Sequence, residues 1–195
     1  MANTDLFPIE FSLVYDNMLV KPKYKEWISP DSIGSTAGIS YFCAPLPLSD
    51  YLFTFVLDGK YLFSSDNSAM LNVSCQKNSL VIFKPGSRFA VKGLTENSHR
   101  IWLHISGKMI PIIMEDLNIS DKHIVEFSDE QFFSIINKFA NLRKASLLQK
   151  ENSISIINST LMFLEEFDKN ETLKSVSLSS ALENAHSLNE KVKLG

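Results

Sequence analysis

The sequence predicts an α+β fold that is mainly β, an antiparallel barrel or sandwich followed by C-terminal helices. Two observations support this prediction. From Phe11 to about Ile105, short runs of β-branched and aromatic residues alternate with turn residues, and no helical period separates them. After Gly107 the apolar residues instead recur at the three- and four-residue spacing of a helix. The 195 residues are enough for one domain with a sizeable core.

The clearest β element is a predicted hairpin. Asp58-Gly59 lies between the strands Tyr51–Leu57 and Lys60–Phe63, and this dipeptide supplies the positive φ angles of a type I′ turn. Both faces of Tyr51–Leu57 are largely apolar, so we expect the barrel interior to cover one face and helices to cover the other. Similar short runs predict further strands at Ile39–Cys43, Met70–Cys75, Leu80–Phe83, Arg88–Val91 and Arg100–Ile105.

The helical part begins with a short predicted helix over Lys108–Leu117. The next helix has a capping box at its start, in which the Ser128 hydroxyl caps the Gln131 amide and the Gln131 side chain reaches back. An apolar stripe at helical spacing follows the capping box, made of Phe132, Ile136, Phe139 and Ala140.

The last long helix is predicted over Glu151–Asp168, and it has two adjoining apolar seams. One seam would be enough to dock the helix on its barrel, so the wider apolar face favours a second partner. We therefore predict a homodimer interface on the first seam. The alternative is a helix that is buried within its own domain. The first seam contains Ile154, Ile157, Leu161 and Leu164, and the second contains Ile156, Thr160, Phe163 and Phe167.

Composition excludes several classes of function. The net charge of −3 provides no field for phosphates, so we expect no nucleic-acid binding by this chain alone. The N-terminus lacks a signal sequence, and no apolar run reaches the ~18 residues of a membrane span. We therefore expect a cytoplasmic protein without membrane contact. Cys43 and Cys75 are expected to be buried and reduced.

Motifs for catalysis are missing from the sequence. Catalytic barrels of this size bind a metal through clustered histidines and a carboxylate, but no histidine lies within ten residues of the Pro85-Gly86 turn. The glycines form no phosphate loop, dinucleotide fingerprint or nucleophile elbow. We expect no enzyme activity, no metal and no cofactor. The four histidines, which show no paired ligand spacing, are His99, His104, His123 and His186.

The order of these motifs resembles a known family. Ala44-Pro45-Leu46 precedes the strand at Tyr51, the Pro85-Gly86 turn follows, and the strand bearing Trp102 comes last. This arrangement is similar to the ligand-binding and dimerisation domain of AraC/XylS-family transcription regulators, a cupin-type β-barrel followed by helices. The resemblance covers residues 8–167 and is clearest over 44–107. It implies an N-terminal arm (1–10), a barrel (11–107), a helical dimerisation segment (108–168) and a linker (169–195) toward a DNA-binding domain that this chain does not contain.

The resemblance also implies a ligand pocket. Trp102 matches the family tryptophan that offers a stacking face, and Arg100 matches a neighbouring polar position. Strand parity places both side chains on one face of the strand. Parity alone does not tell whether this face lines a pocket or lies on the surface, with Arg100 in solvent. Ala44 stands where family sugar sensors have an arginine, so the expected ligand is small, partly apolar and anionic. The candidate ligand-binding residues are Arg100, Trp102, Val91, Phe53 and Phe55, with Phe7 and Pro8 in an arm that folds over the pocket in related sensors.

Two functions remain open at this point. The first is the effector-binding and dimerisation domain of an AraC-type regulator, which contacts DNA only through a further domain. The second is a stand-alone dimeric interaction module that regulates another transcription factor without a small-molecule ligand.

Overall fold

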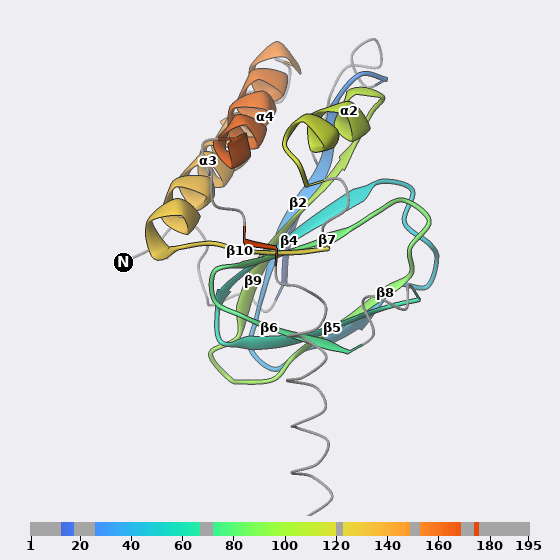
Figure 1. Ribbon diagram of the computed structural model, residues 1–195, viewed down its shortest axis with the longest axis vertical. Coiled ribbons are helices and arrows are strands. Elements are labelled where there is room, and N and C mark those ends of the chain that lie inside the picture. The colour runs from blue at the N-terminus through green and yellow to red at the C-terminus, as the bar shows by residue number, and fades with distance from the viewer. Residues whose placement is uncertain are drawn as a thin grey trace, which may run out of the picture.

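The computed structural model describes residues 13–17, 26–66, 72–119, 123–148, 153–168 and 174–175, arranged in three layers (Figure 1). Helices cover one face of a seven-stranded sheet, and a four-stranded sheet packs on the other face. Every strand pair is antiparallel, which confirms the predicted fold class. The large sheet has the order β1 (Leu13–Asn17), β2 (Ser29–Ala37), β9 (His99–Ser106), β4 (Tyr51–Asp58), β7 (Ser79–Phe83), β10 (Ile124–Glu126) and β11 (Lys174–Ser175). The small sheet has the order β3 (Tyr41–Cys43), β8 (Phe89–Gly93), β5 (Lys60–Ser65) and β6 (Val73–Gln76).

The large sheet separates two hydrophobic cores. Alternate residues of β4 point to opposite faces, so Phe53 and Phe55 contact the helices while Leu52 and Val56 face the small sheet. We call the first core the helix-side core and the space between the two sheets the barrel interior. The prediction that helices cover one face of β4 and the barrel interior covers the other is confirmed.

Three helices follow the strands that form most of the barrel. They are α2 (Met109–Asp116), α3 (Asp129–Leu148) and α4 (Ser153–Asp168). The predicted capping box is confirmed, because the Gln131 amide donates to Ser128 Oγ at 3.3 Å and the Ser128 amide donates to Gln131 Oε1 at 3.1 Å. None of the described helices is long and apolar enough to cross a membrane.

The predicted hairpin at Asp58-Gly59 is wrong. Strands β4 and β5 do not pair with each other, because β4 belongs to the large sheet and β5 to the small one. Gly59 has a φ of +67° and packs against the 95–98 loop, where a Cβ would lie 2.5 Å from Ser98 Cα. The dipeptide therefore marks a corner at which the chain crosses between sheets.

Strand β2 is absent from the sequence prediction, although it pairs with both β1 and β9 in the large sheet. Its sequence, Ser-Pro-Asp-Ser-Ile-Gly-Ser-Thr-Ala, contains few β-branched or aromatic residues and no clear alternation. The other expected strands occur with ends shifted by one to three residues. Residues 1–12, which include Phe7 and Pro8, and the predicted linker (169–195) apart from residues 174–175 lie outside the described part of the chain.

Candidate functional site

Side chains that face the barrel interior from the large sheet form transverse rows. Strand register places Arg100 opposite Thr36 on one side and opposite Val56 on the other. Directly opposite residues lie on the same face of a sheet, so each row contributes neighbouring side chains to the interior. The first row is Thr36, Arg100, Val56 and Ser79, the second is Gly34, Trp102, Thr54 and Val81, and the third is Ser32, His104, Leu52 and Phe83.

Arg100 is a buried cation within this interior. Its side chain is only 6% exposed, and its guanidinium carbon lies 4.6 Å from the centre of the Trp102 ring and 6.0 Å from that of Tyr61. Both distances allow a cation–π interaction. Burial lowers the pKa of Arg100 to about 10, so the group remains a cation at neutral pH. No carboxylate among the described residues forms an ion pair with it.

The interior also contains polar atoms without hydrogen bonds. Five buried side-chain atoms lack a partner in the part of the chain that the structure describes, and four of them belong to the rows around Arg100. Leaving one such group unsatisfied costs about 1–3 kcal/mol. Native proteins hold few of them, and such groups are ordinarily satisfied by ordered water or by a ligand. The four atoms are Arg100 Nε, Thr36 Oγ1, Thr54 Oγ1 and Ser79 Oγ.

The rest of the barrel interior is apolar. Tyr61 and Phe63 from β5 and Val91 from β8 face the large sheet, each at most 2% exposed. Tyr61 donates a hydrogen bond from its hydroxyl to the Thr36 carbonyl at 3.2 Å, and burial raises its pKa to about 12. Cys75 lies in the same core, where burial raises the pKa of its thiol to about 12. An apolar wall around one cation suits a small amphipathic anion.

A second polar contact lies in the third row. His104 Nδ1 is 2.9 Å from Asp50 Oδ1, and the two side chains are 22% and 12% exposed. The pair therefore lies closer to solvent than Arg100. Strand parity puts His104 on the same face of β9 as Trp102. No pattern in the sequence indicates Asp50, which precedes β4 and meets His104 through the β4–β9 register.

The structure brings together some of the predicted ligand-binding residues and not others. Arg100, Trp102 and Val91 all face the barrel interior. Phe53 and Phe55 do not, because alternation along β4 directs them to the helix-side core; their assignment to the pocket is wrong. The functional residues that sequence reasoning missed are the hydroxyls of Thr36, Thr54 and Ser79. Thr36 lies in the unpredicted strand, and the other two are ordinary residues until their partners are known.

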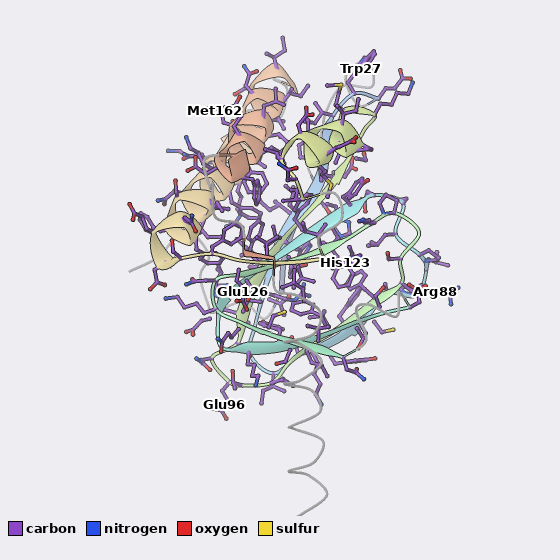
Figure 2. All side chains as sticks on the ribbon, viewed as in Figure 1. Trp27, Arg88, Glu96, His123, Glu126 and Met162 are labelled. Atoms are coloured by element: carbon purple, nitrogen blue, oxygen red, sulfur yellow. The ribbon has the colours of Figure 1, made fainter. Side chains whose placement is uncertain are left out.

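The residues of the predicted dimer seam on α4 lie in two different environments, some buried in the domain and some exposed. Leu164 is 1% exposed and belongs to the helix-side core, so its assignment to a dimer interface is wrong. Ile157 is half-buried against that core. Ile154 and Leu161 are 56% and 37% exposed, and Met162, on the outer side of α4 in Figure 2, is 51% exposed. The second seam, Ile156, Thr160, Phe163 and Phe167, is buried against the domain itself.

The described residues contain no group of three or more histidine, cysteine or acidic side chains that could hold a metal ion. Both cysteines are free, and Cys43 is exposed on β3, contrary to the expectation that both would be buried. The groups that the described part of this interior presents are one cation, hydroxyls and aromatic rings.

No protein-family model matches the chain, and no curated protein matches it in sequence. Solved structures are similar in fold. The Schizosaccharomyces pombe Cnp3 cupin domain has 11% identity and a TM-score of 0.39, over 57% of this chain and 75% of that one. A cupin 2 conserved barrel domain protein from Leptotrichia buccalis has 12% identity and a TM-score of 0.39, over 54% and 46%.

The protein YhaK from Escherichia coli has 15% identity and a TM-score of 0.38, over 49% of this chain and 44% of its own. The chain thus spans less than half the length of two of these three proteins. These similarities concern the fold alone. The strand order and the helices themselves show the predicted fold class, an antiparallel two-sheet barrel followed by helices.

Proposed function

We propose that this chain is the effector-binding and dimerisation domain of an AraC-type transcription regulator. Its effector lies in the barrel interior, with an apolar body against Trp102 and an anionic group at Arg100. One observation carries the proposal: a cation that is 6% exposed stacks on Trp102 and has no acidic partner among the described residues. A buried unpaired charge is costly, so a ligand that neutralises it gains binding energy. The proposal assigns binding, and not catalysis, to this interior.

The exposed apolar residues of α4 support the dimerisation part of the proposal. Ile154 and Leu161 are seven residues apart and therefore lie on one side of the helix, with Met162 next to them. A two-fold interface would pack this strip against its own copy. Joining two DNA-reading domains makes the second DNA contact intramolecular, which raises the affinity for paired half-sites. Contact with DNA belongs to a further domain.

A thermal-shift screen tests the proposal. The panel contains fatty acids, bile acids, sugars and aromatic acids, because a ligand that binds only the native state raises the melting temperature. A Trp27→Phe background leaves Trp102 as the single tryptophan, since the chain has two and Trp27 is 54% exposed. We expect at least one anionic compound to raise the melting temperature and change Trp102 fluorescence. A panel without any such compound would contradict the proposal.

One observation favours the stand-alone interaction module as a second candidate. The edge strand β3 and its flanks expose large apolar side chains and carry no charge that would discourage pairing with another chain. In this case the dimer forms, but no compound of the panel binds. The exposed residues are Ile39 (65%), Tyr41 (69%), Phe42 (47%) and Leu46 (72%).

A further inference from the structure

The unsatisfied atoms of the barrel interior define more than the sign of the ligand's charge. Three of them, on Thr36, Arg100 and Ser79, belong to the first row, and the fourth belongs to Thr54 in the second. Their residues are at most 7% exposed, so bulk water does not satisfy them. We infer that the barrel interior binds a monocarboxylate that carries a hydroxyl group close to its carboxylate and has an apolar body. This inference rests on the proposed sensor function and specifies its ligand.

The first row matches the hydrogen-bonding capacity of a carboxylate. A carboxylate is an acceptor only, with about four lone-pair sites. The Arg100 Nε–H is a donor, and the hydroxyls of Thr36 and Ser79 donate as readily as they accept. Register places Thr36 directly beside Arg100, whereas Ser79 lies two strands from Arg100, roughly 10 Å at the usual strand spacing, so Arg100 and Thr36 are the two groups that one carboxylate can meet together. A carboxylate in front of this row would therefore receive donors from more than one strand.

Charge excludes the main competing ligand classes. Arg100 is the only arginine or lysine in the three rows as defined above, and His104 of the third row lies against Asp50, so these rows compensate one negative charge and not the two of a phosphate monoester. A neutral sugar would satisfy the hydroxyls but leave the buried guanidinium without a counter-charge. A single carboxylate satisfies both requirements.

Thr54 supplies the argument for a ligand hydroxyl. It lies directly opposite Trp102 in the β4–β9 register and is fully buried, and its Oγ1 has no partner. The Arg100 guanidinium stacks at 4.6 Å over the Trp102 ring, so the cation extends from the first row toward the second. A ligand held by Arg100 therefore passes Thr54 close to its carboxylate. A hydroxyl at that point both donates and accepts, as Thr54 Oγ1 requires.

The remaining walls favour an apolar body. Besides the polar groups of the rows and the Tyr61 hydroxyl, the interior is lined by five aliphatic and phenyl side chains that are at most 2% exposed. Burial of a methylene group against such surface contributes roughly 0.8 kcal/mol. These residues are Leu52, Phe63, Val81, Phe83 and Val91.

The experiment measures dissociation constants for three matched probes by calorimetry in the Trp27→Phe protein. The probes are octanoate, its neutral analogue octanamide and 2-hydroxyoctanoate. We expect octanamide to bind at least ~10-fold more weakly than octanoate, and 2-hydroxyoctanoate to bind ~3–10-fold more tightly than octanoate, since each satisfied group changes affinity by about one hydrogen bond. Trp102 fluorescence reports whether each probe occupies the barrel interior.

Variants assign each preference to its residue. Arg100→Met should abolish the preference for octanoate over octanamide, while Arg100→Lys, which keeps the charge but loses the planar fork, should retain part of it. Thr54→Val has nearly the same shape and should abolish only the preference for the hydroxylated probe. The matched control is Thr160→Val, because Thr160 is equally buried but donates to the Ile156 carbonyl at 2.8 Å on the helix side. This control should change neither preference.

The outcomes separate this inference from the proposed function. Equal binding of octanoate and octanamide would overturn the carboxylate, and equal binding of octanoate and 2-hydroxyoctanoate, or a hydroxyl preference that survives in Thr54→Val, would overturn the hydroxyl. If bile acids or sugars bind in the interior and none of the three probes does, the inference fails and the sensor function stands. If no compound of either set binds, both fail.

Discussion

The helix-side core and the barrel interior lie on opposite faces of one sheet, and they differ in the buried polar groups that they contain. On the helix side, Phe55 packs against four rings of α3 and α4, with centroid distances of 5.7 to 6.5 Å. On the other side of the same strand, Thr54 faces a cation and further hydroxyls without partners. Adjacent residues of β4 thus have different purposes. The rings on the helix side fill a packed core, whereas the interior contains buried polar atoms without a protein partner among the described residues.

The largest expected effect is on the helix side. Phe55→Ala should lower the free energy of unfolding by about 4 kcal/mol, because the large cavity left among the four rings cannot collapse. Urea denaturation without ligand measures this loss. Phe133→Ala is the control, since Phe133 on α3 is 44% exposed and its truncation should cost less than about 1 kcal/mol. Equal losses in both variants would remove the distinction between a packed core and a surface ring.

The next effect has the opposite sign. Arg100→Met should raise the free energy of unfolding of the ligand-free protein by about 1–3 kcal/mol, because an apolar side chain of similar length replaces a buried charge without a partner. The same urea experiment measures it. A loss of stability instead would show that Arg100 holds the barrel together, and the contrast between the two sides would then disappear.

A third surface sharpens the comparison, namely the outer side of α4. Leu161→Glu should give a folded monomer, with the free energy of unfolding of the subunit changed by less than about 1 kcal/mol, because Leu161 is 37% exposed. Leu164→Glu, three residues away and 1% exposed, should unfold the domain because it buries a charge. Sedimentation and circular dichroism distinguish the two results. A wild-type chain that is monomeric at micromolar concentration would contradict the dimer.

The smallest effect concerns the two thiols. Cys75 faces the barrel interior, and burial raises the pKa of its thiol to about 12, so it is protonated and unreactive at pH 8. Cys43 is exposed on β3. An aromatic disulfide reagent should therefore titrate one thiol per native chain and two per unfolded chain. Reaction of both thiols in the native protein would mean that the barrel interior around Cys75 opens to solvent.

The sequence predicted the parts of the fold that depend on local patterns. The capping box at Ser128 and the buried seam of α4 follow from spacing alone, and both occur. The corner at Gly59 could not be predicted, because a turn dipeptide fits a hairpin and a crossing between sheets equally well. The difference depends on the distant Ser98, against which Gly59 packs.

The candidate site was predicted only in part, for a related reason. Parity within β9 correctly placed Arg100 and Trp102 on one face, since parity is a property of a single strand. Which face of β4 joins them depends on the register between strands. Without that register the sequence favours the aromatic Phe53 and Phe55, although their neighbour Thr54 is the residue that faces Trp102. Likewise, the amphipathic pattern predicts two apolar seams on α4. It does not predict that Leu161 is exposed while Leu164 is buried.

The first row of the barrel interior does not end at Ser79. Register carries it on to Glu126 of β10 and from there to Lys174 of β11, so a continuous row of paired residues leads from Arg100 to the segment that follows α4. A sheet is stiff along such a line, because each peptide is fixed to the next strand. The connection from β9 to residues 174–175 along this row thus runs through the sheet and not through the helices. The chain that continues toward residue 195 is thus attached to the sheet at the far end of the row that contains the buried cation.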